Sequence, residues 1–206
     1  MDFFGPQNWW PGETPFEVMV GAVLTQNTSW RNVEKAILSL KELGLTTPEA
    51  VLGAPEETLS LALRPSGYFN VKRRRLLNLC RGILDYGSGG LNPAILSLPM
   101  EALRERLLRI KGVGPETADC VVLYAANLPS FVVDAYTRRV LSRHGFMTGD
   151  PPYEEIRLWF MERLEGDASF YNEFHALFVR VGHLFCPPRN PRCHLCPLGS
   201  DPSLSL

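Results

Sequence analysis

The stretch Ile110-Lys111-Gly112-Val113-Gly114-Pro115-Glu116-Thr117-Ala118 decides the fold of this 206-residue chain. Two glycines enclose one apolar residue, between segments whose apolar residues recur at helical spacing. Because glycine lacks a Cβ and tolerates positive φ, such a turn lets backbone approach another molecule closely. Its successive N–H groups, at the start of the second helix, form a donor site for phosphate. The pattern predicts a helix-hairpin-helix that holds a DNA backbone.

A plain connection between two closely packed helices would also explain the glycines, and this interpretation stays open. Basic residues gather at 72–75, 104–111 and 138–143, and acidic residues at 154–165, in a chain with a net charge of −1. This asymmetry favours a one-sided contact with phosphates. Arginines on solvated helix faces would give the same pattern.

Every strong periodic pattern along the chain is helical, so the predicted class is all-α. Thr14-Pro15-Phe16-Glu17 is typical of a helix start, with an N-cap, a first-turn proline and a capping-box glutamate. A helix at 33–40 is expected to end at Gly44, and one at 76–84 to end at glycine-rich residues 87–90. Other helices are expected after 47–49 and 55–57, around the hairpin, and at 134–143, 153–164 and 169–184.

The composition, with 45% hydrophobic residues, is sufficient for a substantial core. No apolar run is long enough to span a bilayer, and the first residues lack the basic and apolar blocks of a secretion signal. We therefore expect a cytoplasmic, monomeric protein that does not associate with membranes.

Asp134 follows the apolar run Phe131-Val132-Val133 and precedes a predicted helix. An aspartate at this place is a sound N-cap. Cleavage of an N-glycosidic bond builds positive charge on the sugar, which a fixed anion stabilises, and a carboxylate can also orient the attacking water. The two roles are compatible, and we hypothesise that Asp134 has both.

The hairpin and Val132-Val133-Asp134 together resemble the endonuclease III superfamily of DNA glycosylases, the helix-hairpin-helix-GPD proteins. Further matching motifs lie at 8–11, 21–28 and 64–72, and they are most similar to the 3-methyladenine glycosylase branch. The likeness extends over residues 9–196. It implies a nucleoid-associated base-excision-repair enzyme whose partner is double-stranded DNA with a damaged base, which is flipped out before its N-glycosidic bond is hydrolysed.

The resemblance also implies two helical lobes with the DNA across the cleft between them. A six-helix bundle at 22–128 contains the hairpin, and residues 1–21 with 129–206 form the second lobe. Asp134 matches the catalytic aspartate, and Gln26 and Tyr68 match positions that fill the gap left by the flipped base. The expected DNA-binding residues are Gln26, Tyr68, Lys111, Gly112, Val113, Gly114 and Thr117.

Bifunctional members of the superfamily carry a lysine two residues after the second hairpin glycine, and its amine forms a Schiff base with the sugar. This chain has Glu116 there, and a carboxylate cannot form an imine. The resemblance therefore implies a monofunctional glycosylase without AP-lyase activity.

An alkylated purine such as 3-methyladenine is electron-poor or cationic, and indole faces attract such rings by stacking and cation–π contact. We expect Trp9, Trp10 and Pro11, with Glu116, to line the base pocket. The tryptophans could instead attach the N-terminal segment to the bundle.

Cys186, Cys193 and Cys196 have the C-x6-C-x2-C spacing that in this superfamily belongs to a [4Fe–4S] cluster, but Pro202 stands where the fourth cysteine is expected. We expect these three thiols to be metal ligands, of an iron–sulfur cluster by preference. A non-cysteine fourth ligand, a three-iron form, a zinc site with His183 or His194, and a metal-free loop stay open. A cluster would brace the C-terminal loop and take no part in bond cleavage.

Two other functions also stay open. One is a glycosylase for oxidised pyrimidines or mismatched bases, and the other is a non-catalytic protein that binds DNA damage.

Overall fold

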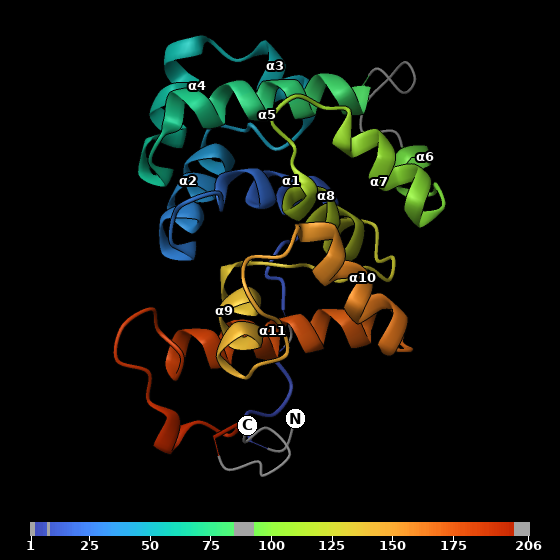
Figure 1. Ribbon diagram of the computed structural model, residues 1–206. Coiled ribbons are helices and arrows are strands. Elements are labelled where there is room, and N and C mark those ends of the chain that lie inside the picture. Colours follow the sequence, from blue (N-terminus) through green and yellow to red (C-terminus); the bar gives the residue numbers. More distant parts are fainter. Residues whose placement is uncertain (1–2, 8, 85–92, 200–206) are drawn as a thin grey trace. The chain divides into compact units, whose positions relative to one another are not determined.

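A computed structural model describes residues 3–7, 9–84 and 93–199 (Figure 1). Within these residues the chain is helical and forms no β-strand, which confirms the all-α class. The glycine-rich residues 87–90, Asn8 and Pro202 lie outside the described residues. The elements are α1 (Pro15–Leu24), α2 (Trp30–Glu42), α3 (Pro48–Gly53), α4 (Glu56–Leu63), η1 (Arg64–Ser66), α5 (Phe69–Leu84), α6 (Pro93–Leu96), α7 (Met100–Leu108), α8 (Pro115–Cys120), η2 (Val121–Ala125), α9 (Ala135–Arg143), α10 (Tyr153–Arg163), α11 (Ala168–Leu184) and η3 (Cys193–Leu195).

The chain divides into two compact units, residues 11–128 and residues 1–10 with 129–206. The expected boundary at residue 22 falls inside α1. Because α1 packs against α2, α5, α8 and η2, the whole helix belongs to the 11–128 unit.

Helix ends follow the capping chemistry expected from the sequence, except that the capping-box carboxylate of Glu17 accepts the N–H of Glu13, at 3.4 Å, in place of the N–H of Thr14. The Oγ1 atom of Thr14 accepts a hydrogen bond from the backbone N–H of Glu17 at 3.2 Å, and Pro15 begins α1. Gly44 follows α2 with φ of 69°, a conformation that glycine adopts without strain. The predicted helix at 169–184 begins one residue earlier, at Ala168, because Asp167 is its N-cap.

The core of the 11–128 unit surrounds α1, which is buried from Val18 to Leu24. Below the hairpin turn, Arg104 of α7 and Asp119 of α8 form a buried ion pair, with Nε 2.9 Å from Oδ1. Removing one partner of a buried pair costs about 3–5 kcal/mol, because the other charge remains out of water. This pair therefore holds the two hairpin helices together.

The second unit has an aromatic core. The rings of Phe131 and Phe160 stack with centroids 3.8 Å apart, and Phe174 and Phe178 of α11 pack around them. Helix α9 packs along α11, and Asp134, which precedes α9, lies next to His175 in the middle of α11.

Lys72 of α5 is unusual because its charged side chain is only 1% exposed. Its Nζ donates a hydrogen bond to the backbone oxygen of Ser66 at 2.5 Å. Burial, assisted by the charge of Arg75, lowers the pKa of Lys72 to about 8.

This pKa makes the stability of the protein depend on pH in a defined direction. Between pH 8 and 10.5 the unfolded chain binds a proton on Lys72 that the folded chain has lost, so the free energy of unfolding rises with pH. Relative to Lys72→Met, we expect the wild type to gain about 3 kcal/mol across this range. Urea unfolding of both proteins at several pH values measures the difference, and a difference independent of pH would contradict the prediction.

Candidate nucleic-acid interface and active site

The hairpin turn depends on its first glycine much more than on its second. Gly112 has φ of 101°, and a Cβ added there would lie 2.5 Å from Cγ of Arg75. Gly114, the N-cap of α8, has φ of −93°, and an added Cβ would meet no atom within 4 Å. Conformation and packing therefore both require glycine at position 112.

Residues of α5 hold the turn from outside the hairpin. The amide of Asn78 donates a hydrogen bond to the backbone oxygen of Lys111 at 2.9 Å. The turn is therefore fixed before any ligand arrives, with the Lys111 side chain exposed and the Val113 side chain buried.

Gln26 connects the end of α1 to the hairpin. Its Nε2 lies 2.9 Å from Oγ1 of Thr117 and 3.5 Å from the backbone oxygen of Gly112, and its Oε1 accepts a hydrogen bond from Arg75. The structure thus brings four residues together, of which Gln26, Gly112 and Thr117 were expected to bind DNA. Because Thr117 is 4% exposed, its hydroxyl serves this internal network, and its role as a DNA contact stays a prediction.

Tyr68 stands at the other expected DNA-contacting position, between η1 and α5. Its side chain is 74% exposed and its φ is 47°, an uncommon conformation for a residue with a Cβ. The preceding backbone is held by Lys72 through the oxygen of Ser66. An exposed aromatic ring on a fixed turn is compatible with the expected insertion into DNA.

The basic run 72–75 is largely engaged inside the protein. Arg73 lies 2.6 Å from Glu56 and bonds Ser60, Lys72 is buried, and Arg75 bonds Gln26. Only Arg74 of this run has an exposed side chain. Charge clustering in the sequence therefore overstates the phosphate-binding capacity of this helix.

Asp134 is the N-cap of α9, as expected. Its Oδ1 accepts a hydrogen bond from the backbone N–H of Thr137 at 2.7 Å, and its Oδ2 lies 3.5 Å from Nε2 of His175. Its side chain is 14% exposed. Burial alone would raise the pKa of this carboxyl, but His175 and the Thr137 N–H outweigh it and hold the pKa of Asp134 below its ordinary value. The carboxylate is therefore charged at neutral pH.

The expected base-pocket residues are divided between the two units. Trp9 and Trp10 are half-buried, with ring centroids 6.3 Å apart and an edge-to-face angle of 78°. Pro11 and Glu116, on the other unit, are exposed. A pocket formed by all four residues stays a prediction.

The three C-terminal cysteines differ in their surroundings. Cys186 is buried beside Val140 and Val181, Cys193 is exposed and Cys196 is half-buried. Across residues 3–7, 9–84 and 93–199, no group of three His, Cys, Asp or Glu side chains is arranged to hold a metal ion. With proline at position 202, these residues do not fit a cluster held by four thiolates. The iron–sulfur cluster remains a prediction, which the iron content of anaerobically purified protein would test.

Two arginines of α9 attach this C-terminal loop. Arg139 donates to the backbone oxygen of Cys186 at 2.6 Å. Arg143 donates to the oxygens of Pro187 and Pro188 at 2.8 and 2.9 Å, and its Nη1 lies 3.1 Å from the Cys186 sulfur. We refer to Arg139 and Arg143 as the arginine clamp. It performs the bracing that was expected of a cluster.

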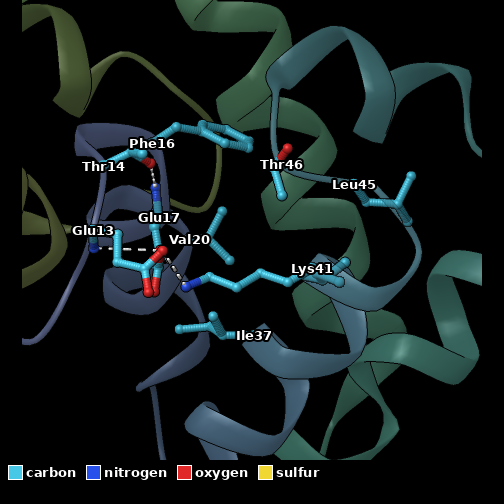
Figure 2. A pocket seen from close by; sticks show the side chains of 10 residues that line it. Glu13, Thr14, Phe16, Glu17, Val20, Ile37, Lys41, Leu45 and Thr46 are labelled. Carbon is cyan, nitrogen blue, oxygen red and sulfur yellow. Dashed lines mark hydrogen bonds and ion pairs between the residues drawn. The ribbon is translucent and has the colours of Figure 1, made fainter.

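A cavity of about 280 Å³ in the 11–128 unit lies apart from these residues (Figure 2). At its polar edge, Nζ of Lys41 lies 3.0 Å from Glu13 and 2.9 Å from Glu17, and these hydrogen bonds raise the pKa of Lys41. No residue expected to bind DNA or to catalyse lines this cavity. The charged groups at its edge pair with one another, so this cavity is not the candidate site.

The family model that matches this chain covers the hairpin and Asp134. Residues 20–165 match the model of the HhH-GPD superfamily of base excision DNA repair proteins, and the chain belongs to this family. It is 43% identical over 198 residues to a protein of Methanocaldococcus jannaschii named a DNA repair glycosylase, covering 96% of this chain and 90% of that one. It is 31% identical over 182 residues to endonuclease III of Sulfolobus acidocaldarius, covering 88% and 78%.

Solved structures agree with this assignment. An endonuclease III in non-covalent complex with DNA has a TM-score of 0.75 and 28% identity, covering 89% of this chain and 80% of that one. The 3-methyladenine DNA glycosylase of H. pylori bound to 1,N6-ethenoadenine has a TM-score of 0.73 and 28% identity, covering 85% and 87%. The protein is thus a DNA repair glycosylase of the endonuclease III family. No helix in its described residues is long and apolar enough to cross a membrane.

The two hairpin glycines provide a matched test of the turn. We expect Gly112→Ala to destabilise the protein by more than about 1 kcal/mol, because alanine resists the positive φ and displaces Arg75. Gly114→Ala should cost much less and serves as the control. Urea unfolding and the affinity for duplex DNA at low salt measure both variants, and equal losses for the two would contradict the analysis.

Proposed function

We propose that the chain is a monofunctional glycosylase that hydrolyses the N-glycosidic bond of alkylated purines such as 3-methyladenine. The observation that carries the proposal is the state of Asp134. Its carboxylate is largely withdrawn from water, is held by two partners and has a lowered pKa. An anion fixed in this way is suited to a reaction that develops positive charge on a sugar.

The chemistry assigned to Asp134 follows from its fixed charge. As the bond between the base and C1′ lengthens, the sugar acquires oxocarbenium character, which the carboxylate stabilises. The same carboxylate orients the water that adds to C1′. Alkylation already weakens the glycosidic bond, so selective capture of the base can replace strong activation of the leaving group.

The distribution of amines supports hydrolysis without lyase chemistry. The chain contains four lysines, Lys35, Lys41, Lys72 and Lys111, and none stands two residues after the second hairpin glycine. Lys41 is held by two carboxylates and Lys72 is buried. Glu116 occupies the position at which bifunctional relatives carry the reactive lysine.

Two features support an alkylated purine as the substrate. The half-buried indoles of Trp9 and Trp10 offer faces that attract a cationic purine. The similarity to the H. pylori 3-methyladenine glycosylase supports the same class of lesion.

The release of bases from defined duplexes tests the substrate and the role of Asp134 together. We expect the wild type to release 3-methyladenine and 7-methylguanine, and Asp134→Asn to lower the single-turnover rate about 100-fold or more. Because asparagine also caps a helix, the variant should fold and should bind an abasic-site analogue normally.

Other outcomes of this panel would overturn parts of the proposal. Release confined to oxidised pyrimidines or mismatched bases would replace the substrate. Binding to damaged duplexes without any release would favour the non-catalytic alternative. An unchanged rate in Asp134→Asn would remove the assigned chemistry.

The absence of a Schiff base has a separate test. With borohydride present during turnover, we expect no covalent protein–DNA adduct, whereas a bifunctional endonuclease III in parallel should be trapped. A trapped adduct of the wild type would contradict the assignment of Glu116, and its loss in Lys111→Ala would identify the amine.

A further inference from the structure

We propose that His175 is the positioning residue of the active site, fixing the Asp134 carboxylate in the orientation that glycosidic-bond cleavage requires. The inference rests on the proposed role of Asp134 and extends the site to a residue on α11. Sequence reasoning did not single out His175, which stands among apolar residues at 174–178.

The carboxylate of Asp134 is held from two directions by two different elements. The Thr137 N–H, from the first turn of α9, binds Oδ1 at 2.7 Å. The imidazole of His175, from the middle of α11, faces Oδ2 with its Nε2 at 3.5 Å. The cap alone would leave Oδ2 without a fixed direction. The histidine supplies the second point that fixes the carboxylate plane.

The position of the imidazole is itself fixed by packing. His175 is 4% exposed, and its ring lies edge-to-face against Phe131, with centroids 6.2 Å apart. Phe131 in turn stacks on Phe160 in the core of the unit. A ring held in this way keeps its place when Asp134 meets a substrate. With water largely excluded, its attraction for the carboxylate is also stronger than at a surface.

The distance suits a contact of the unliganded enzyme. At 3.5 Å the two atoms are in ion-pair range but beyond an ordinary hydrogen bond of 2.7–3.2 Å. Catalytic contacts are often long in free enzymes and shorten in the substrate complex. Exclusion of the remaining water by bound DNA would favour such shortening.

The two arginines of α9 nearest in sequence to Asp134 have other partners. Arg138 bonds Asp150 and the oxygen of Pro151, and Arg139 bonds the oxygens of Ala135, Gly182 and Cys186. The hydroxyl of Tyr153 accepts the N–H of Val133 at 3.3 Å. Among these groups, His175 is the one whose Nε2 faces Oδ2.

A double-mutant cycle separates positioning from mere packing. We expect His175→Phe to slow single-turnover base release about 10- to 100-fold, because the carboxylate loses its fixed orientation. His175→Gln retains an N–H donor and should recover part of the rate. In the Asp134→Asn background, His175→Phe should lower the remaining rate less than about twofold, because the two residues act as a unit.

His144, at the opposite end of α9 from Asp134, provides the control, since His144→Gln should leave the rate unchanged. Melting temperature and affinity for an abasic-site analogue are measured for every variant. Equal losses from His175→Phe in both backgrounds, or no loss in the wild-type background, would overturn the proposal.

A second measurement does not depend on catalysis. The ¹³C resonance of the Asp134 carboxyl carbon, assigned by its absence in Asp134→Asn, reports the pKa of this group. We expect that pKa to rise in His175→Phe and to rise less in His175→Gln. An unchanged pKa in His175→Phe would overturn the inference even if the enzyme is active. A raised pKa in a protein that releases no base would support it while removing the proposed function.

Discussion

The N-terminus of α9 needs a hydrogen-bond acceptor, and the choice of aspartate for that place links the stability of the protein to its chemistry. A helix leaves its first N–H groups without partners, and the Oδ1 atom of Asp134 satisfies one of them. The folding requirement thereby fixes a negative charge at one point of the backbone. The side chain cannot rotate away without uncapping its helix, so the carboxylate is organised before any DNA binds.

In the hairpin unit, a glycine fixes the local backbone in a comparable way. At Gly112 the backbone adopts a conformation that other residues resist, and the absent Cβ leaves room for Arg75. Arg75 then reaches Gln26, which also touches Thr117. The hairpin turn, the end of α1 and helix α5 are therefore parts of one bonded assembly. A change at any of its members would be transmitted to the others.

Local signals in the sequence predicted the elements well, because caps and periodicity act over a few residues. Thr14, Gly44 and Asp134 are found in the expected roles. Short elements such as α6 and η1, which have too few residues for a period, were not predicted.

The partners of buried polar groups could not be predicted, because they come from distant parts of the chain. Lys72 resembles its basic neighbours in the sequence, yet it is buried against a backbone oxygen. His175 resembles a core residue, yet its ring faces a carboxylate from another helix. Tertiary contact, which no local pattern encodes, decided both cases.

The arginine clamp has a consequence for conditions that damage DNA. Guanidinium groups stay protonated at any pH a cell experiences, and backbone carbonyls are inert toward peroxide and other oxidants. The clamp makes six contacts to residues 182–188 and to helix α9. Five of them are to backbone carbonyls, and the sixth is to the Cys186 sulfur. Most of the contacts that anchor the segment after α11 therefore end on groups that neither titrate nor oxidise, so this anchor depends little on pH or on oxidants.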